Sequence, residues 1–141
     1  MIIIEPKARQ LMTADAVKTF PDECCGFLFG IEKRDDRFIT DILIVNNTKE
    51  GDKRRRFEIS PKDYLKAEQY AENNDLQLLG IYHSHPNHPA VPGEHDRVAA
   101  QPWFSYIIIS VRNKDVSAIR SWRLNEHHQF EEERSPDYQF T

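Results

Sequence analysis

The sequence predicts an α/β domain of the α+β kind, in which helices flank a single mixed β-sheet. Two observations support this: apolar runs suited to strands alternate with helical patterns, and no repeat is visible. The chain has 141 residues, of which 39% are hydrophobic, so it can bury one core without disulfide bonds. We therefore expect one domain over residues 1–124, followed by a polar C-terminal tail over residues 125–141. The tail is expected to form one edge strand around residues 128–130 and then to fray.

The first third of the chain predicts a strand, a helix and a hairpin. Residues 2–4 suit a short strand, and residues 6–20 suit a helix with Ala8, Leu11, Met12, Ala16 and Phe20 on one face. Two further apolar runs, 25–32 and 38–45, are expected strands joined by the polar turn 33–36.

The middle of the chain predicts a second helix. A short strand at residues 57–59 should precede it. Ser60 can cap the helix, Pro61 suits its first position, and Asp63 suits the positive end of its dipole. The helix should end near residues 73–74.

The strand that follows carries a candidate metal site. Residues 76–82 are an apolar run, so His83 and His85 come at the end of a strand and point to the same face. Prolines then end the strand, and residues 94–100 suit a short helix with Asp96 in its first turn. Two histidines and one carboxylate are the ligands of a catalytic zinc site that keeps one position open for water.

A zinc-bound water still needs a base to accept its proton. Glu23 is the candidate, because it is a charged residue at the start of an apolar strand. Two strands, at residues 105–111 and 116–123, are expected after the metal loop, joined by a polar turn.

These motifs resemble the JAMM/MPN+ metalloprotease family, which includes deubiquitinating isopeptidases and prokaryotic relatives. The likeness rests on ECCGFLFG from Glu23, on GIYHSHPNHPAVP from Gly80, and on Asp96, and it extends from about Ile2 to Leu124. It implies a cytidine-deaminase-like fold, zinc bound by His83, His85 and Asp96, and Glu23 as general acid/base.

One position departs from the family pattern. The family has a serine three residues before the Asp ligand, and that serine is understood to donate a hydrogen bond to the oxyanion. Gly93 stands there and has no hydroxyl. The loss of one such donor typically costs about 10²- to 10³-fold in turnover. A backbone N–H of Gly93 or Glu94, an ordered water, or His95 could replace it.

Several nearby residues have less certain roles. Ser84 lies between the two histidines and should point to the other face, as a structural hydroxyl or as support for the ligands. His95 and His88 match no motif position and are either solvated or support the site. Cys25 is expected to be a small core residue rather than a ligand or nucleophile.

Charge and cysteine content narrow the partners and the compartment. The net charge of −4 gives no general reason to bind nucleic acid or an anionic membrane. The basic run 53–56 is an exception, either a solvated loop or a docking patch for an acidic partner. Two adjacent cysteines and the absence of a long apolar segment predict a cytoplasmic protein.

The resemblance implies a hydrolase that cuts peptide or isopeptide bonds at the C-terminal Gly-Gly of ubiquitin-like or sulfur-carrier proteins. Compact single-domain members are similar to prokaryotic enzymes that trim or release such proteins. Two alternatives remain open: a catalytically weak binding or scaffold module, and a zinc hydrolase that acts on a small molecule. Retention of Glu23 and all three ligands argues against the scaffold.

Overall fold

The computed structural model describes residues 1–136 of the chain. Within them, seven strands and three helices follow one another. They are β1 (Ile2–Ile4), α1 (Pro6–Thr19), β2 (Cys25–Lys33), β3 (Asp36–Val45), α2 (Pro61–Asn73), β4 (Gln77–Pro86), α3 (Glu94–Ala99), β5 (Ser105–Arg112), β6 (Asp115–Leu124) and β7 (Phe130–Glu133).

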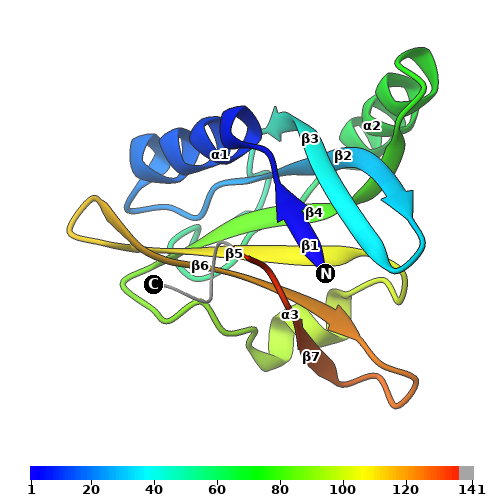
Figure 1. The fold of residues 1–141 in the computed structure, drawn as a ribbon. Helices are drawn as coiled ribbons and strands as arrows, with labels where there is room; N and C mark the ends of the chain where they lie inside the picture. Colours follow the sequence, from blue (N-terminus) through cyan, green and yellow to red (C-terminus); the bar gives the residue numbers. More distant parts are fainter. Residues whose placement is uncertain (137–141) are drawn as a thin grey trace.

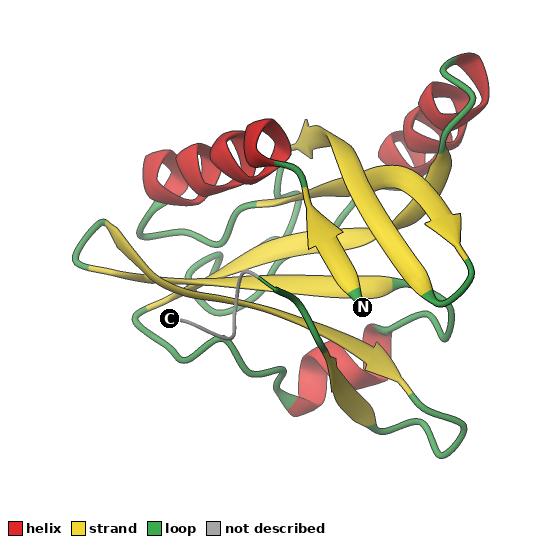
Figure 2. Ribbon diagram, viewed as in Figure 1, coloured by secondary structure: helices red, strands yellow, loops and turns green. Residues whose placement is uncertain are grey.

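The strands form one mixed sheet, as predicted (Figures 1 and 2). Its order is β1-β3-β2-β4-β5-β6-β7. The β1–β3 and β4–β5 pairs are parallel, whereas the other neighbours are antiparallel. Strand β4, which carries the candidate histidines, therefore lies in the centre, between β2 and β5.

The two faces of the sheet are buried by different helices. On one face, α1 contributes Ala8, Met12 and Ala16 to a core that includes Leu28, Tyr82 and Ile109. On the other face, α2 contributes Ala67 and Ala71 to a core that includes Phe27, Phe29 and Ile81. The alternation of side chains along each strand supplies both cores. None of the helices in residues 1–136 is long and apolar enough to cross a membrane.

The helix ends follow the predicted chemistry. The hydroxyl of Ser60 accepts a hydrogen bond from the Asp63 N–H, so the predicted N-cap of α2 is confirmed. In α1, Ala8, Met12 and Ala16 are buried as expected, but Leu11 is 44% exposed.

The predicted strand at residues 57–59 is wrong. The Asn47 side chain and the Thr48 backbone take the hydrogen-bonding groups of this segment: Glu58 N–H donates to Asn47 Oδ1, and Glu58 O accepts from Thr48 N–H. A side chain thus replaces the neighbouring strand that the segment would need.

The predicted polar tail contains part of the sheet. An edge strand was expected around residues 128–130, and the structure has β7 at Phe130–Glu133, paired with β6. Beyond it, the Arg134 carbonyl accepts a hydrogen bond from Ile2 N–H, at the opposite edge of the sheet. The fraying predicted for the end of the tail falls partly on residues 137–141, which lie outside the described residues.

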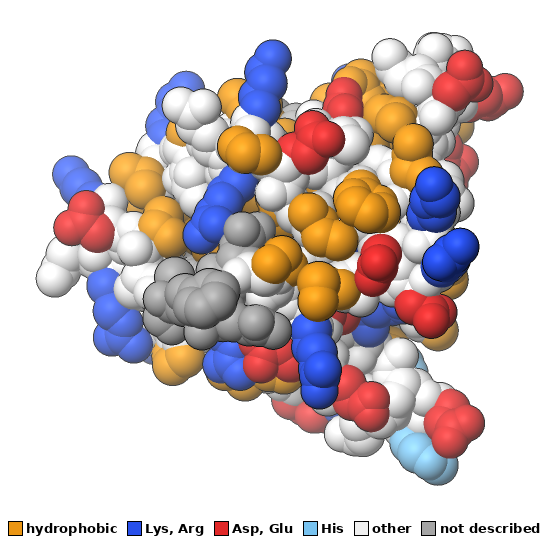
Figure 3. Space-filling view, viewed as in Figure 1, with side chains coloured by type: hydrophobic (Ala, Val, Ile, Leu, Met, Phe, Trp, Pro, Cys, Tyr) orange, Lys and Arg blue, Asp and Glu red, His pale blue; other side chains and the backbone are white. Residues whose placement is uncertain are grey.

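Part of the sheet surface is apolar and exposed. Ile3, Phe38 and Ile31 lie side by side across β1, β3 and β2. Ile31 is 50% exposed and Phe38 is 37% exposed. Figure 3 shows hydrophobic side chains in the middle of this face, with charged side chains around them.

The parallel contact between β4 and β5 leaves no room for a side chain at Gly80. A Cβ atom there would lie 1.9 Å from the Ser105 carbonyl oxygen, which belongs to the backbone and cannot move alone. We expect Gly80→Ala to lower the free energy of unfolding by about 1–3 kcal/mol or more, since overpacking forces the strands apart. Thermal unfolding of the two proteins measures this. Gly93→Ala is the matched control, because a Cβ there meets only Asp96 Oδ2, at 3.8 Å; equal losses would contradict the argument.

Candidate active site

The end of β4 brings His83 and His85 to one face of the sheet, as the spacing predicted. His83 pairs with Cys25 of β2 on one side and with Ile108 of β5 on the other. The side chain of His83 is 1% exposed and that of His85 is 12% exposed. The His83 ring also stacks on Phe57, with ring centroids 4.5 Å apart. Both rings are therefore held by a rigid central strand.

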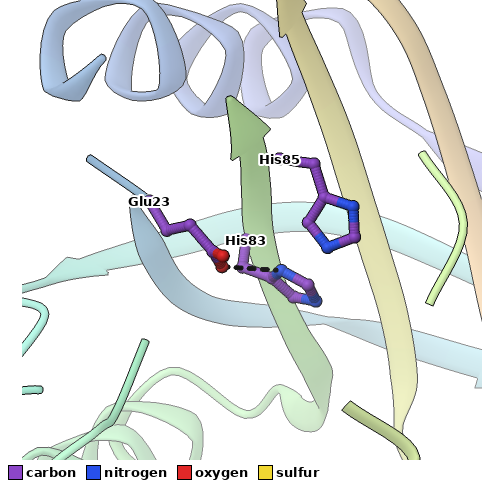
Figure 4. A group of neighbouring side chains, drawn as sticks. All are labelled: Glu23, His83 and His85. Carbon is purple, nitrogen blue, oxygen red and sulfur yellow. Dashed lines mark ion pairs between the residues drawn. The ribbon is translucent and has the colours of Figure 1, made fainter. Parts of the chain in front are cut away.

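Glu23 lies beside His83 because the chain before β2 is fastened to β4. Cys24 N–H donates to the Ser84 hydroxyl at 2.8 Å, and Ser84 N–H donates to the Cys24 carbonyl at 3.2 Å. The Glu23 carboxylate is buried, and its Oε1 lies 3.5 Å from His83 Nδ1 (Figure 4). Ser84 thus points away from the histidines, as predicted, and holds the backbone next to Glu23.

The loop after β4 is fixed by strands β5 and β6. Asn87 N–H donates to the Val111 carbonyl at 2.7 Å, and Trp122 Nε1–H donates to the Ala90 carbonyl at 3.0 Å. The Pro89 carbonyl accepts from His85 Nδ1 at 2.9 Å. That hydrogen bond leaves Nε2 of His85 as the nitrogen with a free lone pair.

Asp96, in the first turn of α3, completes the group of predicted residues. Its Oδ2 lies 3.5 Å from His85 Nε2, and its Oδ1 lies 3.9 Å from His83 Nε2. The same carboxylate accepts a hydrogen bond from Gly93 N–H at 2.8 Å. The two ring nitrogens of His83 therefore face different carboxylates, Glu23 and Asp96.

The protonation of Asp96 and His85 reflects these contacts. Burial raises the pKa of Asp96, but electrostatic interaction with His83 and hydrogen bonds with His85 and Gly93 N–H outweigh it, so the pKa is held well below its usual range. Burial lowers the pKa of His85, but Asp96 and the Pro89 carbonyl outweigh burial, and the pKa is raised. Asp96 is thus an anion beside two imidazoles.

The chemistry of this cluster fits a divalent metal such as zinc. Glu23, His83 and His85 offer donor atoms that all lie within 4.8 Å of one another, and Asp96 approaches both histidines from the other side. His83 Nδ1 is buried and makes no hydrogen bond to any described residue. Two imidazoles with carboxylates at hand are the donor set of catalytic zinc sites. The residues present therefore suit the metal.

The space beside Gly93 is open. Its φ of −89° is accessible to any residue, and a Cβ would meet nothing nearer than Asp96 Oδ2 at 3.8 Å. Gly93 N–H already donates to Asp96, so it cannot also donate to a substrate oxyanion. His95 is exposed and lines both cavities next to the site, whereas His88 lines only one of them.

The cysteines take no part in the site. Both are free thiols buried in the core, as expected for Cys25. Burial raises the pKa of Cys25 to about 12, so its thiol stays protonated at neutral pH.

Two residues of the site were not predicted from the sequence. Phe57 covers one side of the His83 ring. Asn47 donates through Nδ2 to the carbonyls of Glu23 and Arg56, and accepts from Lys49 N–H and Glu58 N–H. No local pattern indicates either contact, since both depend on how residues 46–59 fold back beside the start of β2.

The fold and this cluster define a domain with a candidate metal site at the end of the central strand of its sheet. A family model described as prokaryotic homologs of the JAB domain matches residues 5–125. The chain belongs to this family, and the assignment makes it a JAB-type hydrolase.

Proteins similar to the chain agree with this assignment. A desampylase from Pyrococcus furiosus is 34% identical over 113 residues, which cover 78% of the chain and 72% of the relative. A CysO-cysteine peptidase from Mycobacterium tuberculosis is 29% identical over 125 residues, or 88% of the chain and 83% of the relative. The solution structure of a protein from Desulfitobacterium hafniense has a TM-score of 0.84 and 31% identity, and the match covers 96% of this chain and 91% of that one.

The two hydrogen bonds between Ser84 and Cys24 predict a measurable effect on stability. We expect Ser84→Ala to lower the free energy of unfolding by about 1–3 kcal/mol, because the buried Cys24 N–H loses its acceptor. Denaturant unfolding monitored by fluorescence measures it. Ser117→Ala is the control: its hydroxyl donates to Ser110, so its removal leaves no backbone N–H without an acceptor and should cost less than Ser84→Ala. Equal costs would mean that the hydrogen bond from Cys24 N–H to Ser84 contributes no more to stability than the Ser117 hydroxyl does.

Proposed function

We propose that the protein hydrolyses the peptide or isopeptide bond after the C-terminal Gly-Gly of a ubiquitin-like or sulfur-carrier protein. The observation that carries the proposal is the meeting of two imidazoles and two carboxylates at the end of β4. The similarity to a desampylase and to a CysO-cysteine peptidase supports the substrate class.

We propose His83, His85 and Asp96 as the zinc ligands. Asp96 is favoured over Glu23 as the carboxylate ligand, because Asp96 lies within 4 Å of Nε2 of both histidines. When bound there, zinc would polarise the scissile carbonyl and lower the pKa of a water molecule to about 7.

We propose Glu23 as the general acid/base. Its backbone is held on both sides: Glu23 N–H donates to the Lys53 carbonyl, and the Asn47 side chain donates to the Glu23 carbonyl. The carboxylate can accept a proton from the attacking water and return it to the leaving amine. Its small exposure keeps bulk water from competing for that proton.

A cavity of about 300 Å³ beside His83 supports binding of an extended chain end. Its lining includes Phe57, Tyr64, Ile81 and Tyr106, with His95 and Asp96 at the metal side. A tail that ends in two glycines has no side chains to clash there, so its carbonyl can approach the histidines closely. The apolar walls also exclude water around the scissile bond.

The central test is cleavage of ubiquitin-like and sulfur-carrier proteins that carry residues after Gly-Gly. We expect the zinc-loaded protein to cut after the second glycine, and Glu23→Gln to reduce the rate by about 10²- to 10⁴-fold, because the base is lost. Intact mass spectrometry detects the products.

Metal analysis of the same variants separates the two roles. Glu23→Gln should keep about one zinc per chain, and His85→Ala should lose it. Zinc loss in Glu23→Gln would make Glu23 a ligand instead. A folded, zinc-loaded protein that cuts no substrate would favour a scaffold or a small-molecule hydrolase.

The open space at Gly93 gives a gain-of-function prediction. We expect Gly93→Ser to raise kcat by about tenfold or more, because a hydroxyl there adds an oxyanion donor that a glycine side chain lacks. Steady-state kinetics on one substrate measures the change. Gly93→Ala, which adds the Cβ without the hydroxyl, should leave kcat near that of the parent protein. A lower or unchanged kcat in the serine variant would show that another group already serves the oxyanion.

A further inference from the structure

The segment that covers the site carries a charge opposite to that of the rest of the chain. Residues 46–59 hold five basic and three acidic side chains, which leaves fourteen basic and twenty acidic residues elsewhere. Four of the basic residues are consecutive, from Lys53 to Arg56, and all four are exposed. We refer to these four residues as the basic loop. It is a local positive surface on a protein of net charge −4.

Hydrogen bonds fasten the basic loop to the catalytic region. The Lys53 carbonyl accepts from Glu23 N–H at 2.7 Å. Asn47 Nδ2 joins the Arg56 carbonyl, at 3.0 Å, to the Glu23 carbonyl, at 3.2 Å. The backbone of the loop is thus attached at two points to the residue proposed as general base.

The basic loop also forms one wall of the opening to the site. Arg55 lines a cavity of about 370 Å³ together with Glu23, His85 and Asp96. This cavity shares His95 and Asp96 with the apolar one. A substrate that reaches the metal ligands through it passes the loop.

Most of the positive charge in the loop is not neutralised within the protein. Arg55 approaches Asp52 at 3.8 Å, and Asp52 also accepts from Arg54 N–H. Throughout residues 1–136, no carboxylate forms an ion pair with Lys53, Arg54 or Arg56. Four adjacent cations with one weak internal partner are suited to attract an external anionic surface.

We propose that the basic loop docks an acidic surface of the substrate protein, next to the tail that enters the site. This inference rests on the proposed function. The loop would steer the folded body of the substrate, while the buried site acts on its chain end. A protein fits better than a nucleic acid, because the cations form one short cluster rather than a groove along a polyanion, and the remaining charge is negative.

Charge reversal tests the proposal. Arg54→Glu/Arg56→Glu changes two side chains of the loop that do not line either cavity next to the site. The matched control is Lys7→Glu/Lys33→Glu, at the ends of α1 and β2 that lie away from Glu23. The substrates are an acidic ubiquitin-like protein with residues after Gly-Gly and a short peptide with the same C-terminal sequence. For each variant, kcat/KM is measured on both.

We expect the ratio of protein to peptide kcat/KM to fall about tenfold in the loop variant at low salt, and to change little in the control. The difference should shrink at high salt, which screens the attraction. A ratio that is unchanged, or equal losses on protein and peptide, would overturn the proposal.

Binding separates docking from chemistry. The same acidic protein is titrated into Glu23→Gln, with and without the loop substitutions, and the dissociation constant is measured at two salt concentrations. Salt-sensitive binding that the loop substitutions weaken supports docking even if no bond is cut, and then only the proposed reaction fails. A dissociation constant that the loop substitutions leave unchanged overturns docking. Tighter, loop-dependent binding of a single-stranded DNA oligonucleotide would reassign the loop to nucleic acid.

Discussion

The backbone pairing between the start of β2 and the end of β4 is the constraint on which the site depends. Cys24 and Ser84 exchange hydrogen bonds, and Cys25 lies opposite His83 in the register. This pairing sets Glu23 beside His83, although sixty residues separate them in the chain. Because β4 is central and paired on both sides, the histidines are held more rigidly than a loop could hold them. The histidines are therefore the fixed part of the site, and the segments that carry Glu23 and Asp96 pack against them.

The two carboxylates reach the histidines by different means, which suits different roles. Glu23 is buried and fixed through its own backbone, whereas Asp96 is more exposed and sits on a helix of one and a half turns. Two hydrogen bonds hold the loop before that helix: Trp122 Nε1–H donates to the Ala90 carbonyl, and Asn87 N–H donates to the Val111 carbonyl. A carboxylate ligand needs to reach an ion held between the two rings, and Asp96 faces Nε2 of both histidines. A base needs shelter from water, and Glu23 has it.

Local patterns predicted most of the fold and the residues that meet at the end of β4. Alternation in β4 predicted that His83 and His85 share a face, and the Pro61 start of α2 followed from capping chemistry. What failed was the segment around Phe57, which looked like a strand by composition. Its backbone groups bond to Asn47 and Thr48, and its ring packs on His83. Such contacts join distant segments and leave no periodic trace in the sequence.

The same segment joins the surface charge to the buried site. Asn47 Nδ2 donates hydrogen bonds to the carbonyls of both Glu23 and Arg56, so a shift of the basic loop would also shift the backbone of the proposed base. Phe57, the next residue after Arg56, packs on a proposed metal ligand. A protein partner bound at the loop would restrain these contacts, because each lies within a residue or two of an exposed cation. The basic loop and Glu23 are thus joined by hydrogen bonds, and a partner that docks at the loop would also restrain the position of Glu23.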